Sequence, residues 1–212
     1  MKKIKVILVD DHELVRMGFR LLLEGANNLE VIAEFSSGEE VVNEFLNYEF
    51  DLIVIDISMP GIGGIEAIKR ILLKKPKTKI LVLSAHEDDL HANRVLKAGA
   101  KGYLTKRSAP SELVEAINKV VSGETFLELE IAKSIALKQV TGEKEPIERL
   151  SSKEFEIFLE LAKGKSVNSI ADTMSLSPRT VGTHLYNIKQ KLSAGNSAEL
   201  TLIALRAGLL EN

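Results

Sequence analysis

The first 122 residues alternate short apolar runs with amphipathic stretches, and the pattern repeats five times. The apolar runs lie at 4–9, 31–35, 52–55, 80–83 and 102–104. The stretches with helical spacing lie near 12–24, 38–48, 64–75, 87–98 and 110–121. Apolar runs this short are typical of strands buried on both faces. The alternation predicts an α/β domain in which right-handed crossovers place helices on both faces of a parallel sheet.

The last third of the chain has a different pattern. Residues 147–212 show no strand signal, and their apolar spacing predicts four short helices, near 152–163, 167–174, 178–192 and 197–208. Two sequence signals support the helix starts: Ser151 stands three residues before Glu154, and Ser177 directly precedes Pro178. We therefore predict an all-α four-helix domain after the α/β domain.

The segment between these two domains changes character within a short distance. Residues 126–140 can form one helix, whereas residues 141–146 are polar and contain Gly142 and Pro146, which is typical of a flexible tether. The sequence thus predicts three parts, with boundaries at 1–122, 123–146 and 147–212.

Polar side chains follow the predicted strands of the first domain. Asp10 and Asp11 follow the first run, Asp56 the third and Ser84 the fourth, while Lys106 lies just past the fifth. The carboxyl ends of parallel strands meet at one edge of a sheet, so these side chains should converge. Neighbouring carboxylates raise each other's pKa, and Mg²⁺, which prefers oxygen ligands, relieves that conflict. The arrangement predicts a magnesium site that handles a phosphoryl group.

Composition narrows the classes of protein to consider. The chain has no cysteine, which excludes disulfides and thiolate metal sites. The first apolar run is too short for a signal sequence or a membrane span, so we expect a cytoplasmic protein with no membrane partner. The net charge is −2, but residues 163–191 hold five Lys or Arg against Asp172 alone, a local charge of +4. That stretch fits a phosphate-facing patch and a solvated helix surface equally well.

Motifs of the first domain resemble those of bacterial response-regulator receiver domains, in the same order and spacing throughout residues 1–122. They are ILVDD at 7–11, DLIVIDISMPG at 51–61, LVLSA at 81–85 and GYLTK at 102–106. The resemblance implies a flavodoxin-like five-stranded parallel sheet with strand order 2-1-3-4-5.

The resemblance also implies roles for the converging side chains. Asp56 would accept a phosphoryl group from a sensor histidine kinase. Magnesium would be held directly by Asp11, Asp56 and the backbone carbonyl of Ser58, and through water by Asp10. Lys106 and Ser84 would bind the phosphoryl oxygens. Tyr103, whose place in a buried strand is otherwise explained by core packing, would be the aromatic residue that switches rotamer together with Ser84.

Residues 166–192 fit a helix-turn-helix with its turn at 175–177. In the second helix, Val181, Leu185, Ile188 and Leu192 form one apolar stripe, and polar or basic side chains occupy the opposite face. A face of this kind on a well-capped helix can enter the major groove. An ordinary amphipathic bundle explains the stripe equally well.

The motifs of this region resemble the LuxR-type DNA-binding domain. They include LSSKE at 150–154, AKG at 162–164, LSPRTV at 176–181 and THL at 183–185. The whole chain resembles the NarL/FixJ family of two-component response regulators, and KSVN at 165–168 with AELT at 198–201 favours its GacA/UvrY-like branch. The resemblance implies DNA contacts from Arg179, Thr180, Gly182, Thr183, Tyr186, Asn187 and Lys189.

The resemblance further implies that two copies of this domain pair through the final helix. Leu200, Ile203, Ala204 and Leu209 offer an apolar face there. The alternative is that this face packs only on its own domain.

Two positions depart from the family pattern. Gly182 stands where lysine is common, and Tyr186 stands where another basic residue is common. Glycine inside a helix costs about 1 kcal/mol relative to alanine, and at this position it also removes a cation from the face that reads bases. We expect an altered sequence preference or weaker intrinsic binding rather than loss of DNA binding.

The leading hypothesis is a phosphorylation-switched transcription factor that dimerises on double-stranded DNA, with RNA polymerase as a candidate partner. One alternative is a phosphatase or transferase with an aspartyl-phosphate intermediate. Such an enzyme needs its own acid or base near Asp56, and the residue two positions on is Ser58. We therefore expect no enzyme beyond the receiver's own phosphorylation and slow dephosphorylation. The other alternative is an interaction adaptor with reduced DNA binding, which Gly182 favours.

Overall fold

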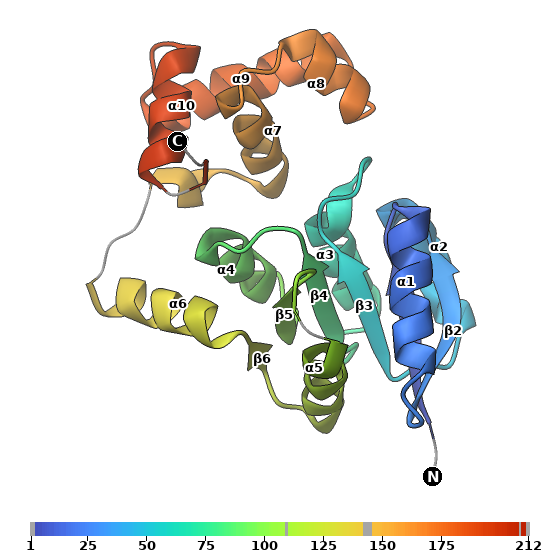
Figure 1. The fold of residues 1–212 in the computed structure, drawn as a ribbon. Helices are drawn as coiled ribbons and strands as arrows, with labels where there is room; N and C mark the ends of the chain where they lie inside the picture. Colours follow the sequence, from blue (N-terminus) through green and yellow to red (C-terminus); the bar gives the residue numbers. More distant parts are fainter. Residues whose placement is uncertain (1–2, 109, 142–145, 208, 211–212) are drawn as a thin grey trace. The chain divides into compact units, whose positions relative to one another are not determined.

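The computed structural model describes residues 3–108, 110–141, 146–207 and 209–210. The chain divides into two compact units, Met1–Ile135 and Ala136–Asn212, and each is described by itself. Unit 1 is an α/β domain and unit 2 is helical (Figure 1), as the sequence predicts. The finer boundaries at 122 and 146 remain predictions.

Unit 1 is built on a parallel sheet in the order β2-β1-β3-β4-β5-β6. The strands are β1 (Ile4–Val9), β2 (Leu29–Phe35), β3 (Leu52–Asp56), β4 (Ile80–Ser84), β5 (Gly102–Thr105) and β6 (Phe126–Leu127). The five predicted strands and their order are confirmed. The prediction of exactly five is corrected, because β6 adds a sixth strand, pairing Gly102 with Phe126 and Tyr103 with Leu127. Two residues are too few to show an alternating pattern, which is why the sequence predicts the start of a helix there instead.

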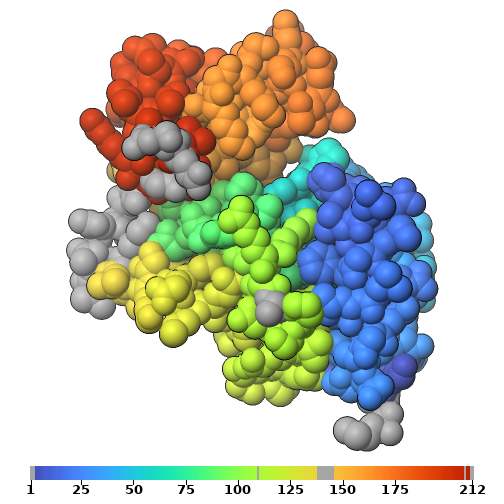
Figure 2. Space-filling model, viewed as in Figure 1, coloured from blue at the N-terminus to red at the C-terminus, as the bar shows by residue number. Residues whose placement is uncertain are grey.

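Helices cover both faces of this sheet. Helices α1 (Glu13–Glu24) and α5 (Pro110–Ser122) pack on one face, and their side chains form a continuous surface in Figure 2, in blue and yellow-green. Helices α2 (Gly38–Glu44), α3 (Gly63–Lys74) and α4 (Asp89–Lys97) pack on the other, with a short 3-10 turn, η1 (Phe45–Asn47), after α2. Alternate residues of each central strand enter the two cores, which explains why these strands are apolar throughout.

Helix α6 (Leu129–Thr141) follows β6 and starts three residues later than the predicted helix. Ile131 and Ile135 join the core beside α4. The Ser134 hydroxyl donates a hydrogen bond of 2.6 Å to Asp89 Oδ2, which fixes the helix to the start of α4. Of the predicted tether, residues 142–145 lie outside the described residues.

Unit 2 contains η2 (Pro146–Arg149) and helices α7 (Ser152–Ala162), α8 (Val167–Thr173), α9 (Pro178–Leu192) and α10 (Ser197–Arg206). The four predicted helices are therefore confirmed. Ser151 and Glu154 form a reciprocal capping box at the start of α7, and the Ser177 hydroxyl accepts the Thr180 N–H at the start of α9. Phe158 and Ile188 are fully buried in the core between these helices.

Within the described ranges, every helix is too short or too polar to span a bilayer.

The start of α3 approaches the end of β3 so closely that it admits only glycine. A Cβ at Gly64 would lie 2.2 Å from the Asp56 carbonyl oxygen and 2.5 Å from the Ile57 Cα. We expect Gly64→Ala to lower the free energy of unfolding of unit 1 by about 1–3 kcal/mol, because backbone must shift to make room. Urea unfolding of the full chain measures this effect.

Gly18 is the matched control, since it lies within α1 and a Cβ there meets nothing within 4 Å. Gly18→Ala should raise the free energy of unfolding, by up to about 1 kcal/mol. Equal stability of the Gly64→Ala variant and the wild type would show that the α3–β3 contact is less tight than the structure indicates.

Candidate functional site

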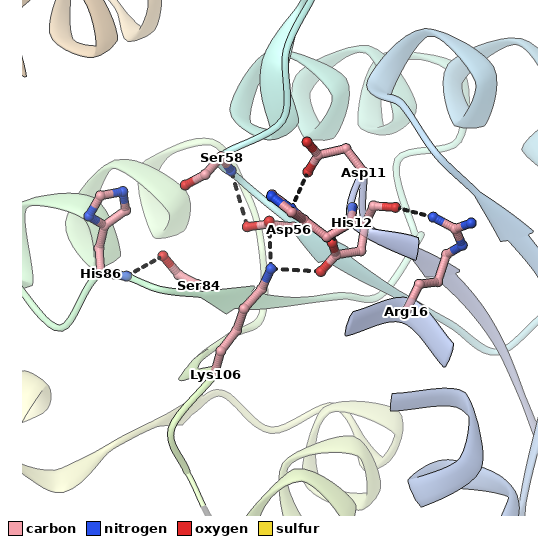
Figure 3. Close-up of polar contacts among 9 residues, drawn as sticks. Asp11, His12, Arg16, Asp56, Ser58, Ser84, His86 and Lys106 are labelled. Carbon is pink, nitrogen blue, oxygen red and sulfur yellow. Dashed lines mark hydrogen bonds and ion pairs between the residues drawn. The ribbon is translucent and has the colours of Figure 1, made fainter. Parts of the chain in front are cut away.

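The carboxyl edge of the sheet brings together the polar residues that follow its strands (Figure 3). Asp10 follows β1, Asp56 ends β3, and Lys106 follows β5. The Lys106 Nζ lies 2.6 Å from Asp10 Oδ2 and 2.7 Å from Asp56 Oδ2. Residues separated by 96 and 50 positions thus form one ion-paired cluster, as the strand order predicts.

In this cluster, burial and ion pairing have opposite effects on the pKa of Asp56 and also on that of Lys106. Asp10 and Asp56 are each only 2% exposed. Burial raises the pKa of Asp56, and the opposing charge of Lys106 does not fully offset it. Burial alone would lower the pKa of Lys106, but Asp56 and Asp10 outweigh that effect and raise it. Lys106 is therefore a firmly charged group between two buried carboxylates, of which Asp56 is costly to ionise.

Backbone groups orient the two buried carboxylates. Asp56 Oδ1 accepts a hydrogen bond of 3.1 Å from the Ser58 N–H, so its other oxygen faces Lys106. Asp10 Oδ1 accepts one of 2.9 Å from the His12 N–H. The Arg16 guanidinium donates to the Asp10 carbonyl oxygen at 2.7 Å. These contacts hold both carboxylates in one orientation and hold the turn after β1 against α1.

The same cluster offers ligands for a cation. Asp10, Asp11, His12 and Asp56 each contribute one candidate ligand atom, and these atoms lie within 4.8 Å of one another. Among the described residues, Asp11 Oδ1 is buried and accepts no hydrogen bond, although the His12 Nδ1 lies 3.1 Å away. A buried carboxylate oxygen without a donor fits a hard divalent cation, so the residues present suit Mg²⁺. His12 was not among the predicted site residues, since its only signal is its place directly after the aspartate pair.

Ser84 and Tyr103 meet at a third residue, His86. The Ser84 hydroxyl, fully buried at the end of β4, accepts the His86 N–H at 3.0 Å (Figure 3). The Tyr103 hydroxyl donates to the His86 carbonyl oxygen at 2.7 Å. The Tyr103 ring is fully buried in the core, and burial raises the pKa of its hydroxyl. Both predicted switch residues therefore contact the backbone of one loop, between β4 and α4.

In unit 2, the predicted DNA-contacting residues lie along α9, outside its buried stripe. Four are exposed, namely Arg179, Thr180, Thr183 and Tyr186, and three are half-buried, namely Gly182, Asn187 and Lys189. Several of their polar groups already have partners. Thr180 Oγ1 lies 2.8 Å from Ser177 Oγ, the Thr183 hydroxyl donates to the Arg179 carbonyl oxygen, and Lys189 Nζ lies 3.4 Å from the Gly195 carbonyl oxygen.

Two features of unit 2 bear on its predicted roles. A Cβ at Gly182 meets nothing within 4 Å, so packing inside the unit does not require glycine there. The expected apolar face of the last helix is corrected in part, because Leu200 and Ala204 are fully buried within their own unit. The large apolar residue that α10 exposes is Leu202, at 51%.

A buried ion pair holds α9 to α7 and was not anticipated. Glu154 is 4% exposed, and its Oε2 accepts both the Ser151 N–H at 2.8 Å and the Lys191 ammonium at 2.6 Å. Burial raises the pKa of Glu154, but hydrogen bonds from Lys191 and Ser151 outweigh it and lower the pKa. The capping residue of one helix thus positions the end of the other. The capping signal was visible in the sequence, whereas the pairing with Lys191 depends on the helix crossing.

Comparisons with known proteins agree with this geometry. The family profile described as "Response regulator receiver domain" matches residues 6–118, and the profile described as "Bacterial regulatory proteins, luxR family" matches residues 148–204. The response regulator UvrY of Escherichia coli K12 is 42% identical over 208 residues, covering 97% of this chain and 95% of UvrY. The response regulator GacA of Pseudomonas aeruginosa is 38% identical over 210 residues, covering 98% of each chain.

Solved structures are similar over nearly the whole chain. RcsB of Salmonella typhimurium is similar with a TM-score of 0.72 at 27% identity, covering 98% of this chain and 99% of RcsB. RcsB of Salmonella enterica serovar Typhimurium, bound to the promoter rprA in the presence of the phosphomimetic BeF₃⁻, is similar with a TM-score of 0.68 at 26% identity, covering 95% and 98%.

The raised pKa of Asp56 predicts how stability depends on pH. A carboxyl whose pKa is higher in the folded than in the unfolded chain destabilises the fold once pH exceeds the unfolded value, about 4 for aspartate. Without added metal, Asp56→Asn should therefore raise the free energy of unfolding at pH 7. The gain should shrink as pH falls and vanish below about pH 4, where the carboxyl is neutral in both states.

Urea unfolding in EDTA at several pH values measures this dependence. The exposed Asp172, in unit 2, provides the control substitution Asp172→Asn, which should leave the pH profile unchanged. An Asp56→Asn variant that is less stable than the wild type at pH 7, by a difference that disappears only as pH falls below about 4, would mean that the folded state lowers the pKa of Asp56 instead of raising it.

Proposed function

Because the chain belongs to the response regulators that join a receiver domain to a LuxR-type DNA-binding domain, we propose that phosphorylation of Asp56 by a sensor histidine kinase controls its dimerisation and its binding to specific DNA, and thereby transcription. The observation that carries the proposal is the ammonium of Lys106 between the buried carboxylates of Asp10 and Asp56, in a chain that also carries a helix-turn-helix. Such a cluster responds directly to a change of charge on Asp56.

The chemical step is a phosphoryl transfer. A carboxylate oxygen of Asp56 attacks the phosphorus of a phosphohistidine; the new O–P bond forms, the N–P bond breaks and the imidazole leaves. Mg²⁺, held by Asp11, Asp56 and the Ser58 carbonyl and through water by Asp10, would neutralise phosphoryl charge. Lys106 supplies a further positive charge for the transferred oxygens. Catalysis of this kind consists mainly of positioning and charge neutralisation.

The acyl phosphate formed on Asp56 should persist as a signal. The residue two positions on is Ser58, which cannot serve as a general base for attacking water. For this reason we assign the protein no enzymatic activity beyond its own phosphorylation and slow dephosphorylation.

The loop between β4 and α4 provides a path for the signal. A phosphoryl group on Asp56 offers a strong acceptor to the Ser84 hydroxyl, which now accepts the His86 N–H. Movement of Ser84 toward that acceptor disturbs the loop that Tyr103 also holds through the His86 carbonyl. We infer that Ser84 and Tyr103 together report phosphorylation to α4.

Helix α9 is the candidate recognition helix. It begins at a well-formed cap, buries Val181 and Ile188, and presents Arg179 and Tyr186 to solvent. Its basic residues suit DNA phosphates, and a relative of the same architecture has been solved with promoter DNA. DNA, a kinase and RNA polymerase as partners would place the protein in the cytoplasm.

Phosphorylation of Asp56 is tested directly with acetyl phosphate and Mg²⁺. The wild type should gain one phosphate per chain that hydroxylamine removes, as an acyl phosphate requires, and Asp56→Asn should gain none. Asp11→Ala should slow the reaction more than Asp10→Ala. Removal of a direct metal ligand weakens Mg²⁺ binding more than removal of a residue that binds the ion through water. Phosphate-affinity gels and intact mass spectrometry provide the measurement.

Asp172→Asn is again the matched control and should be phosphorylated like the wild type. Full labelling of Asp56→Asn, or equal rates with and without EDTA, would contradict the assignment of this site.

DNA recognition is tested by fluorescence anisotropy on duplexes selected by the phosphorylated chain. Arg179→Ala should weaken binding to selected and scrambled duplexes by a similar factor and reduce the salt slope by about 1, because the side chain contacts phosphate. Tyr186→Ala should instead change the preference between duplexes. Gly182→Lys should tighten binding, because it adds a cation at a position with open space.

Lys163→Ala, at the exposed end of α7, is the control for loss of a charge away from α9. If Gly182→Lys weakens binding to the selected duplex alone, Gly182 allows close approach of the backbone to DNA. If no duplex is selected in either phosphorylation state, the protein is an adaptor and the proposal for DNA is wrong.

A further inference from the structure

A second group of candidate metal ligands lies in unit 1, apart from the carboxylate cluster. His86, Asp88 and His91 come from the loop after β4 and from the first turn of α4. One candidate ligand atom from each lies within 4.8 Å of the other two. The proposed phosphotransfer uses the His86 backbone but none of these three side chains.

We propose that His86, Asp88 and His91 form a second metal site, which binds a borderline divalent transition metal such as Zn²⁺. The ligands are an imidazole nitrogen from each histidine and one carboxylate oxygen, with water completing the coordination. Sites with three protein ligands of this kind and an open position are common for zinc. The inference concerns metal binding alone and does not depend on the proposed function.

The geometry between Asp88 and His91 supports this proposal. The His91 Nδ1 lies 2.7 Å from Asp88 Oδ2 and 2.9 Å from Asp88 Oδ1, so the two groups are hydrogen-bonded. Zinc bonds to nitrogen and oxygen are about 2.0–2.2 Å long, which puts neighbouring tetrahedral ligands roughly 3.3 Å apart. An ion can therefore bind between the two groups with a small separation of their side chains.

The second histidine lies directly against the first. The His86 and His91 rings stack with centroids 3.9 Å apart and an angle of 3° between their planes. A metal lies in the plane of each imidazole that binds it, so the His86 ring must tilt out of the stack to bring a nitrogen to an ion held by His91; the candidate ligand atoms already lie within 4.8 Å of one another.

The surrounding contacts hold the ligands in place before any ion binds. Asp88 is the N-cap of α4 and accepts the His91 N–H at 2.9 Å, which fixes both residues of the pair. His91 is 5% exposed. Ser84 and Tyr103 fix the backbone of His86. Ligands that are already ordered lose little conformational entropy on binding, so the site should bind its ion with useful affinity.

The donor types distinguish the two clusters. The site around Asp56 is rich in carboxylate oxygens and suits Mg²⁺, whereas two imidazoles with one carboxylate suit Zn²⁺, Ni²⁺ or Cu²⁺. A solution that contains both Mg²⁺ and Zn²⁺ should therefore fill the two sites with different ions.

The test is a zinc titration of the full-length chain in excess Mg²⁺, in competition with a chromophoric zinc chelator. We expect one Zn²⁺ per chain. His86→Gln and His91→Gln should each weaken Zn²⁺ binding at least about tenfold. That factor is the lower end of the loss in affinity seen when a group that supports a bound metal is removed. Asp88→Asn should also weaken it while preserving the helix cap, because asparagine caps as well as aspartate does.

The chain offers matched controls, because its four histidines include two outside this cluster, His12 and His184. His12→Gln and His184→Gln should leave zinc binding unchanged. Nitrogen-detected NMR of the imidazoles provides a second measurement on the wild type: the signals of His86 and His91 should shift on addition of Zn²⁺, and those of His184 should not.

The proposal is overturned if the wild type binds no Zn²⁺ in excess Mg²⁺, or if the double variant His86→Gln/His91→Gln binds it as tightly as the wild type. It is also overturned if His12→Gln alone removes binding, because the ion would then occupy the carboxylate cluster. If the variants fold poorly, the imidazole signals of the wild type decide whether His86 and His91 bind Zn²⁺.

Discussion

The ion pairs of Lys106 with Asp10 and Asp56 are the interaction on which the rest of unit 1 depends. Two carboxylates that are each 2% exposed lie at one edge of the sheet, and Lys106 lies within 2.7 Å of an oxygen of each. Removal of the ammonium would be strongly destabilising, since both carboxylates would then remain buried without a positive partner. The ends of β1, β3 and β5 are thus held together by charge as well as by packing. A phosphoryl group on Asp56 would add negative charge beside the Lys106 ammonium, which in the structure offsets the charges of the two carboxylates.

Two loops connect that point to the outer elements of unit 1. One contains Ser84, whose hydroxyl holds the backbone that leads into α4. The other contains Lys106 and continues to Ser108, whose hydroxyl donates a hydrogen bond of 2.6 Å to Glu128 Oε1. The same Glu128 oxygen accepts the Thr105 N–H at 2.6 Å, so the residues on either side of Lys106 are fixed to the start of α6. A movement of Lys106 toward a phosphoryl group would therefore act on α6, and a movement of Ser84 would act on α4. These two helices are joined by the hydrogen bond between Ser134 and Asp89.

The sequence could predict the sheet and its polar edge because both follow from simple constraints. Strands buried on both faces are apolar throughout, and the carboxyl ends of parallel strands converge, so Asp10, Asp56 and Lys106 had to meet. The features that escaped prediction lack such a periodic signal. Strand β6 has two residues. The pairing of Glu154 with Lys191 depends on how two helices cross, and the stacking of His86 on His91 depends on the path of a loop. No local pattern encodes contacts of this kind.

We propose that the phosphorylation state of Asp56 controls which DNA the protein binds. The most direct measurement is genome-wide capture of DNA fragments by the full-length chain, before and after phosphorylation with acetyl phosphate and Mg²⁺. We predict that phosphorylation enriches a defined set of fragments that share an inverted repeat, since a two-fold dimer requires half-sites with its own symmetry. Recovery of the same fragments with the same yield in both states would contradict this claim.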